Sequence, residues 1–425
     1  MTRPSCPTFE ELTALIAGDV KQGVAAHVDS CERCMRLVEV ARQAVRVNIG
    51  DALLKDSVRD IDLLVDSLLE LSPEERLRAS TADDYLRPGL ARRFSELATE
   101  AWDMDLNTAL EHIHVATAIA DHLAIRNGHA AELQFELWKN RSTIHRERGE
   151  TDAARACLMR ATSAIDRCDD REMKHAIVWY ADAAICASRD VWEPQQALEL
   201  LIRAERVFLL RDREKRRGAQ TLRGIVHLHG GEYPAAVEEF AAVLAGTDPR
   251  AGSVFADAQR NLANALIRVG RSDEAENLLN AARTFDRAAN RELSVTRDDA
   301  LLAFAAEANG HFDRAARGYA DVRRRFTAAG EHESALIAGK DLAVMLVAMD
   351  RFRDAAAILR ELLEHANSNG GDRRRFTAEA LAYLRELAQH DQLTLDVASP
   401  VSRYVDRIHV QRAIPFTPPM PLFTM

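Results

Sequence analysis

The chain has 425 residues, of which 47% are hydrophobic, 29% are charged and only 6% are aromatic. This composition is typical of a folded all-α protein with almost no β-strand, and the length allows two or three domains or one long repeat array. The formal net charge of −10 makes the chain as a whole repel nucleic-acid phosphates and anionic membranes, so direct binding to either would need a local basic patch.

His27, Cys31 and Cys34 form an H-x3-C-x2-C pattern within a segment that otherwise predicts a helix. Because an α-helix turns by about 100° per residue, the three side chains fall on one face. Cys6 precedes a helix expected over residues 9–17, and a hairpin of the two helices brings Cys6 beside the other three. A set of three cysteines and one histidine is a closed, structural zinc site with no open position for catalysis. The predicted cofactor is therefore zinc.

These four residues, with the helical pattern from Phe9 to Gly18, resemble the zinc-binding anti-sigma-factor domain of bacteria. The resemblance covers residues 1–46 and implies a sigma factor as a partner. The alternative is two buried cysteines and a surface histidine, but thiols at metal-ligand spacing in a chain without an export signal favour zinc. The sequence shows no signal peptide and no run of 18 apolar residues, so we expect a cytoplasmic protein without a membrane span.

Residues 47–90 predict a helical connector. Its apolar residues recur at helical spacing, namely Ile61, Leu64, Val65, Leu68 and Leu69. Ser72 then caps a new helix, with Pro73 at its first position and Glu75 three residues after the cap, and residues 87–89 break the pattern again. Either the connector binds a partner, as the corresponding helix does in the resembled family, or it caps the next domain.

Residues 91–392 repeat with a period of about 40. Each unit has a turn residue, an aromatic or polar residue two positions later and an alanine five positions later. The clear copies are Gly149/Thr151/Ala154, Gly231/Tyr233/Ala236, Gly270/Ser272/Ala275, Gly310/Phe312/Ala315 and Asp350/Phe352/Ala355, with weaker ones at Trp192/Ala197 and Met104/Ala109. Glycine permits the turn between two helices, and alanine lets the helices approach closely. One hairpin cannot bury its apolar face alone, so we expect the copies to stack.

The sequence NLANA at 261–265, followed by GRSDEA at 270–275, resembles the tetratricopeptide-repeat consensus. The resemblance implies a right-handed α-solenoid in which first helices line an inner groove and second helices form the outer wall. We expect a capping helix over residues 373–389 to end the array. The proline-rich residues 393–425 predict an extended tail, which either lies on the array or serves as a ligand for another protein.

Four residues form the predicted partner groove. Arg260 and Asn264 point inward on one first helix with Asn261 beside them, and Lys340 takes the position of Arg260 two repeats later. In the resembled repeat family an inward asparagine hydrogen-bonds the backbone of a bound peptide, while lysine or arginine pairs with its carboxylates. The alternative for each residue is that it serves only solubility.

The sequence holds no recognisable catalytic arrangement, and we predict that the protein is not an enzyme. No glycine-rich loop precedes a Lys-Ser or Lys-Thr pair, and no G-x-G-x-x-G follows a strand. Cys157, Cys168 and Cys186 fit small buried apolar residues. The arginine clusters at 211–217, 323–325 and 373–375 are typical of solvated helix ends or ion-paired faces, so no direct nucleic-acid binding is expected.

Two functional hypotheses follow. In the first, the protein is a cytoplasmic transcription regulator whose zinc hairpin binds a sigma factor or similar partner, while the repeat array binds a second protein or peptide. In the second, it is a scaffold or adaptor, and zinc only helps a segment fold that is too short to hold a core unaided.

Overall fold

The computed structural model describes residues 61–102, 105–126, 130–366, 372–390, 392–411 and 415–419. Over these ranges the chain consists of α-helices joined by short turns and contains no strand, which confirms the all-α prediction. The predicted zinc segment, residues 1–46, and the first part of the connector lie outside the described residues. None of the described helices is long and apolar enough to cross a membrane.

The contacts divide the chain into two compact units, Met1–Leu137 and Trp138–Met425. The division falls within one helix, α7 (Ala131–Glu147). It lies inside residues 91–392, over which we expected one array, and the domain boundaries expected from the sequence stay a prediction. The spacing of 45 residues between Ala109 and Ala154 exceeds that of the later copies and marks the irregular region of the repeat.

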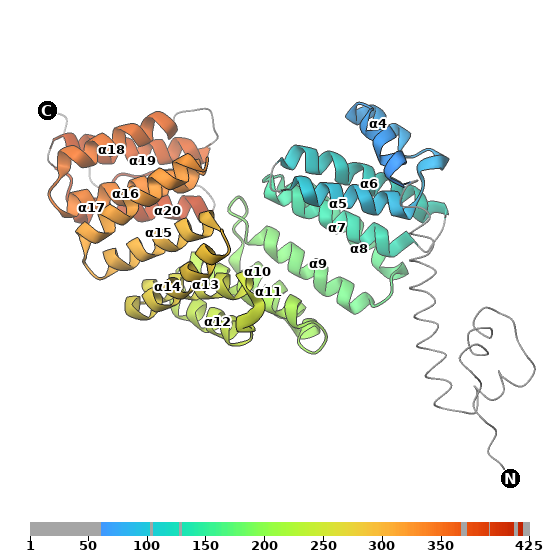
Figure 1. Cartoon of the computed structure of the whole chain (residues 1–425), viewed down its shortest axis with the longest axis horizontal. Helices are drawn as coiled ribbons and strands as arrows, with labels where there is room; N and C mark the ends of the chain where they lie inside the picture. The colour runs from blue at the N-terminus through green and yellow to red at the C-terminus, as the bar shows by residue number, and fades with distance from the viewer. Residues whose placement is uncertain are drawn as a thin grey trace, which may run out of the picture. The chain divides into compact units, whose positions relative to one another are not determined.

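In the first unit, helical residues 61–69 are followed by α4 (Pro73–Ala79), the 3-10 turn η1 (Asp83–Tyr85), α5 (Pro88–Ala101) and α6 (Leu106–Arg126) (Figure 1). The predicted cap is confirmed, since the Ser72 amide donates to Glu75 at 3.2 Å and Pro73 begins α4. Ile61 is buried, and α4 packs against α6. The described part of the connector therefore packs on the helices that follow it, as the capping interpretation expects.

The second unit contains the regular repeat (Figure 1). Its second helices are α8 (Thr151–Ala164), α10 (Pro194–Phe208), α12 (Tyr233–Ala245), α14 (Ser272–Ala288), α16 (Phe312–Ala328) and α18 (Phe352–Ala366). Its first helices are α9 (Arg171–Cys186), α11 (Arg213–Gly230), α13 (Ser253–Arg268), α15 (Glu292–Ala308), α17 (His332–Ala348) and α19 (Asp372–Gln389), with 3-10 turns η3 (Ile165–Arg167) and η4 (Pro249–Ala251). From α8 to α19 each helix packs against the next along the chain.

The repeat signature has the structural role expected of it. The turn glycines Gly149, Gly231, Gly270 and Gly310 have φ between 75° and 82°, in the left-handed region that glycine adopts most easily. Asp350 and Trp192 take the same place with φ of 57° and 49°. The alanine of every copy is completely buried, namely Ala109, Ala154, Ala197, Ala236, Ala275, Ala315 and Ala355. Small residues at these positions let the paired helices approach closely.

The prediction of an extended tail from residue 393 is wrong for its first part. Residues Leu395–Val410 form a helix, α20, with Pro400 inside it. Proline removes one backbone hydrogen bond near the start of the helix, but the helix buries a complete apolar face against α17 and α19. Tertiary packing therefore outweighs the local preference.

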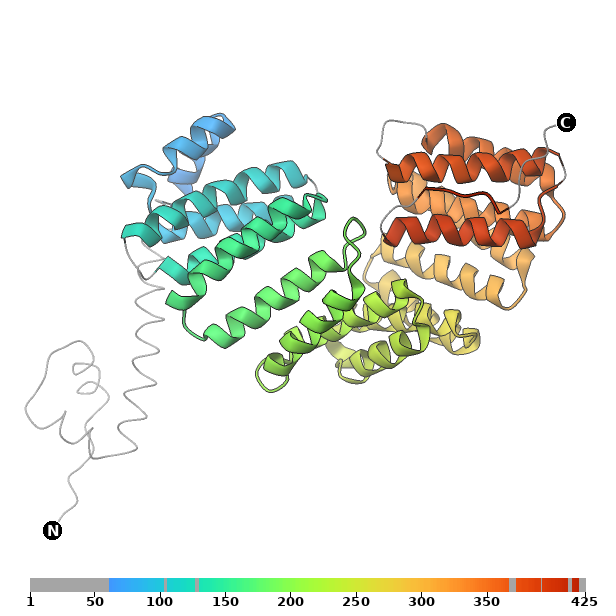
Figure 2. The same ribbon diagram turned by 180° about the vertical axis from the view of Figure 1, so that it is seen from behind.

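The tail is extended at residues 415–419, as predicted. Figure 2 shows this segment running between α19 and α20. The ring of Phe416 lies 5.6 Å from that of Tyr383 on α19 and 5.1 Å from that of Tyr404 on α20, measured between centroids. Of the two roles left open for the tail, the described part lies on the chain's own surface.

Replacing Gly224 by alanine should destabilise the second unit. A Cβ there would lie 2.6 Å from Cε1 of the buried Phe240 on α12, so the pair of helices must move apart. We expect a loss of about 1–3 kcal/mol in the free energy of unfolding in urea. The matched control is Gly230→Ala in the same helix, where a Cβ meets nothing within 4 Å. Glycine to alanine should be neutral or stabilising there, and equal stability of the two variants would contradict this packing.

Candidate functional site

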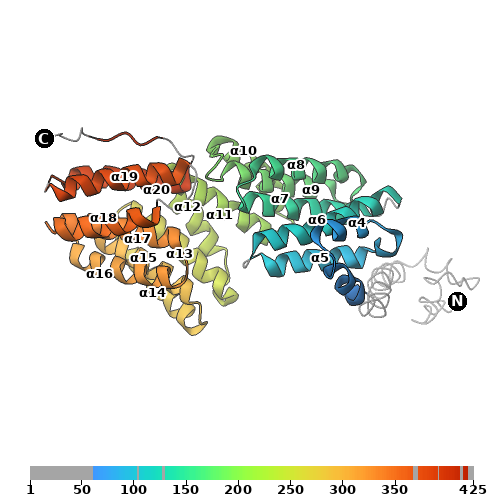
Figure 3. The ribbon, with the colours of Figure 1, turned by 90° about the horizontal axis from the view of Figure 1, so that it is seen from above.

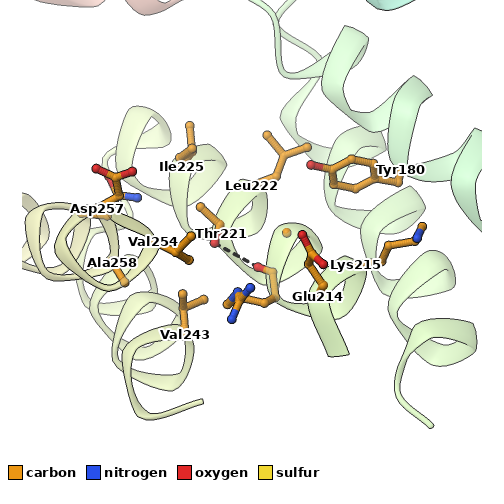
Figure 4. A pocket seen from close by; sticks show the side chains of 13 residues that line it. Tyr180, Glu214, Lys215, Thr221, Leu222, Ile225, Val243, Val254, Asp257 and Ala258 are labelled. Carbon is orange, nitrogen blue, oxygen red and sulfur yellow. Dashed lines mark hydrogen bonds between the residues drawn. The ribbon is translucent and has the colours of Figure 1, made fainter. Parts of the chain in front are cut away.

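A groove of about 610 Å³ lies on the first-helix side of the second unit (Figure 4). Its lining residues come from α9, α11 and α13, with one from α12: Tyr180, Glu214, Lys215, Arg217, Gly218, Thr221, Leu222, Ile225, Val243, Val254, Asp257, Ala258 and Asn261. First helices were expected to line the groove, and all but Val243 belong to first helices.

The groove combines an apolar wall with polar groups. Leu222, Ile225 and Val254 supply apolar surface, and Tyr180 closes one end (Figure 4). Burial raises the pKa of the Tyr180 hydroxyl, so it stays protonated and can donate a hydrogen bond at neutral pH. Gly218 leaves space in front of this hydroxyl, since a Cβ at Gly218 would come within 3.5 Å of it.

Of the four predicted partner residues, Asn261 lines the groove. Asn264 lies one turn further along α13 and is half-buried, outside the lining. Sequence reasoning missed Leu222 and Ile225, although the repeat contained the signal for them. The turn residues Gly231 and Gly270 are 39 residues apart. Counting back 39 residues from Asn261 and Asn264 gives the equivalent positions in the preceding repeat, Leu222 and Ile225. The groove runs between equivalent positions of neighbouring first helices.

Arg260, which was expected to face a partner, is bound by carboxylates of its own chain. Its Nε donates to Asp298 on α15 at 2.7 Å and its Nη1 to Asp257 at 2.6 Å, while its Nη2 pairs with Asp286 on α14. Burial lowers the Arg260 pKa, but the hydrogen bonds that Arg260 donates to Asp298 and Asp257, with their negative charges, outweigh burial and the net shift is upward. Arg260 therefore joins α13, α14 and α15 behind the groove instead of facing a ligand.

The carboxylates in this cluster outnumber the guanidinium groups. Arg291 also pairs with Asp286 and Asp257, so two arginines face three aspartates. The side chains of Asp286 and Asp298 are fully buried, and one carboxylate oxygen of Asp298 has no hydrogen-bond partner. Burial, with a smaller contribution from Asp286, raises the pKa of Asp298 to about 6 against the opposing effect of Arg260.

Lys340 is not exposed to the groove, contrary to expectation. Its side chain is fully buried, and Nζ lies 2.9 Å from Asp406 and 2.6 Å from Ser402, both on α20, and also pairs with Asp341. A buried ammonium group requires such partners. The sequence correctly placed Lys340 on the first-helix face, but that part of the face is covered by α20.

The predicted zinc ligands Cys6, His27, Cys31 and Cys34 lie outside the described residues. Within the described ranges, no group of three or more His, Cys, Asp or Glu side chains is placed to hold a metal ion. The cysteines of the repeat array, Cys157, Cys168 and Cys186, are buried as expected. Burial raises the pKa of Cys186 to about 11, which keeps it in the weakly reactive thiol form.

No protein-family model and no curated protein matches the sequence. Among solved structures, aspartyl phosphate phosphatase F from Bacillus subtilis is similar, with a TM-score of 0.51 at 12% identity over 76% of this chain and 89% of that one. The apo form of RapI gives a TM-score of 0.49 at 13% identity over 65% and 97%. A tetratricopeptide repeat protein from Parabacteroides merdae gives 0.45 at 18% identity over 70% and 98%.

The likeness to the Bacillus phosphatase shows a shared fold and nothing further. With the hairpins, left-handed turns and buried alanines described above, the chain has a tetratricopeptide-like helical-repeat fold. The predicted stacking of repeated helix hairpins is therefore confirmed for the described residues.

The buried Asp298 should make stability depend on pH. Its carboxyl binds a proton in the folded state below about pH 6, whereas an unfolded aspartate does so only near 3.8. The folded state thus holds more protons between these values, and stability rises as the pH falls through 6. Between pH 7 and pH 5 the wild type should gain about 1 kcal/mol relative to Asp298→Asn.

Urea unfolding at pH 5, 6 and 7 measures this difference. Asp313→Asn is the control, because Asp313 forms an exposed pair with Arg317. A variant at Asp298 that keeps the wild-type pH profile would show that this carboxyl is already ionised throughout the range.

Proposed function

We propose that this protein is a regulatory or adaptor protein that binds a segment of a protein partner in the groove between α9, α11 and α13. The main support is a set of polar side chains that line the groove and have no side-chain partner among the described residues. The Tyr180 hydroxyl, the Arg217 guanidinium and the Asn261 amide make no side-chain hydrogen bond or ion pair with another described residue. Together they offer donors for carboxylates and donors and an acceptor for a peptide backbone.

The shape and composition of the groove favour a peptide over a small substrate. It is open, and Leu222, Ile225 and Val254 provide an apolar wall for one or more side chains of the partner. Glu214 and Asp257 balance Lys215 and Arg217, so the groove does not select strongly for one charge. The lining contains no histidine or cysteine, and the Thr221 hydroxyl donates to the carbonyl of Arg217 in its own helix. We therefore propose binding without catalysis.

For the N-terminal segment we propose a zinc ion held by Cys6, His27, Cys31 and Cys34, and a sigma factor as the partner. The support is the H-x3-C-x2-C spacing and the resemblance to anti-sigma-factor domains. In this proposal the protein is a cytoplasmic transcription regulator, and the repeat array adds a second binding surface. The alternative remains a scaffold in which the zinc hairpin is only structural.

The groove proposal predicts that Val254→Asp weakens peptide binding. Peptides are first selected on the full chain from a random phage-displayed library, and the strongest is synthesised for calorimetry. Val254 is 41% exposed in the groove, and a carboxylate there would remove apolar contact, so we expect at least a tenfold increase in Kd. The matched control is Ile202→Asp on the second helix α10, where isoleucine is 43% exposed. A larger effect of Ile202→Asp would place binding on the outer wall instead.

The zinc proposal predicts about one zinc ion per full-length chain by plasma mass spectrometry, and almost none in the Cys31→Ser, Cys34→Ser double variant. Cys157→Ala serves as a control because Cys157 is buried in α8. It should keep the metal. Equal zinc content in the double variant and the wild type would refute the predicted ligand set.

The same variants separate the two hypotheses for the partner. The full chain is mixed with sigma factors of the same organism, one at a time, and complex formation is followed by co-purification and by inhibition of transcription. An anti-sigma function predicts a complex that the double cysteine variant loses while peptide binding in the groove persists. No complex with the wild type would leave the scaffold function.

A further inference from the structure

Helix α20 lies on the first-helix face of the array. It packs against α17 and α19, which are both first helices. The second helix α18, which lies between α17 and α19 in the sequence, also packs against both of them. Figure 3 shows α20 in this group with α17 and α19. The stacking from α16 to α19 is complete without α20, because each of these helices already packs against its neighbours along the chain. The helix therefore lies on the array as an additional element.

The contact surface of α20 is that of an amphipathic helix in a groove. Ala398, Val401, Val405 and Ile408 follow one another at intervals of three or four residues, and each is at most 1% exposed. This spacing places them on one face, which is the pattern by which helical ligands bind hydrophobic grooves. The four side chains are small or medium in size, and none is aromatic. Pro400 also removes a backbone hydrogen bond from the helix itself.

A polar contact fixes the position of the helix along the groove. Asp406 and Ser402 lie one turn apart on α20 and both meet the buried Nζ of Lys340, at 2.9 and 2.6 Å. Asp341 pairs with the same ammonium group. Glu307 accepts a hydrogen bond from the Tyr319 hydroxyl at 2.7 Å and lies close enough for its negative charge to add to burial in raising the pKa of Asp341. Lys340 thus selects a helix that brings a carboxylate to this point.

The end of α20 extends toward the open groove. His409 Nδ1 lies 2.6 Å from Glu333 at the start of α17, and Glu333 also pairs with Arg189 at 2.9 Å. The Gln411 amide donates to the carbonyl of His229 at the end of α11, a helix that also lines the open groove. The contacts of His409 and Gln411 thus hold the end of α20 at the start of α17 and the end of α11.

We propose that the face of α17 and α19 is a second binding site, for an amphipathic helix of a partner protein that brings a carboxylate to Lys340, and that α20 is the ligand held there until such a helix displaces it. The proposal goes beyond the groove function and does not depend on it. Its occupant is defined by the helix already present, which has an apolar stripe of small side chains and a hydroxyl one turn before the carboxylate.

The test uses the full chain and a fluorescent synthetic peptide with the sequence of residues 393–411. Asp406→Lys places a second positive charge against Lys340, so α20 of that variant should leave its site. We expect the peptide to bind Asp406→Lys at least tenfold more tightly than the wild type, measured by fluorescence anisotropy. A peptide carrying Asp406→Asn should bind this variant at least tenfold more weakly than the unchanged peptide. The unchanged peptide should bind Val254→Asp and the wild type with equal affinity.

Hydrogen exchange by mass spectrometry provides a second test that needs no variant. In the wild type, amides of 401–408 should exchange at least tenfold faster than those of α16 and α17, because α20 opens separately. If α20 exchanges only together with α16 and α17, the proposal is overturned. It is also overturned if the peptide fails to bind Asp406→Lys although α16 and α17 keep their protection in that variant. A dimer of the wild type formed by mutual exchange of α20, seen by light scattering and lost in Asp406→Lys, would overturn the choice of a partner helix.

Discussion

The close approach of paired helices at one alanine in each repeat determines the rest of the structure. Because each of these alanines is fully buried, the first and second helices of a hairpin can lie near enough to share one apolar core. From Ala154 onward, the left-handed residue five positions earlier reverses the chain at the required point. Together they place successive first helices side by side, as α13 and α15 are. The groove is a consequence of that arrangement, since its lining comes from neighbouring first helices.

The repeat could be predicted from the sequence because both of its determinants are local. A glycine and an alanine at fixed spacing specify the turn and the close contact without reference to distant residues. The division of the chain within α7 and the helix α20 were not predicted. For α20, the proline content pointed to an extended segment, whereas the decisive fact is a hydrophobic surface on α17 and α19 that is distant in sequence.

In the candidate site, too, contacts between residues distant in the sequence could not be predicted. The sequence identified inward positions on the first helices, and Asn261 lines the groove. Asp257 and Asp341 are near Arg260 and Lys340 in the sequence, but nearness alone did not show that they pair. The partners that bury the two charges between helices, Asp298 and Asp406, are 38 and 66 residues away and could not be predicted. Some positive charges on the inner face hold helices together, as Arg260 and Lys340 do, and for Arg217 we propose contact with a partner.

We propose the first-helix face of the second unit as the binding surface. The most direct measurement is hydrogen exchange of the full chain with and without a saturating groove-selected peptide, followed by mass spectrometry. We expect protection to increase in α9, α11 and α13 and to change little in the second helices α12 and α14. Protection confined to α12 and α14, which together with α13 line a separate hollow around Leu278, would contradict this proposal.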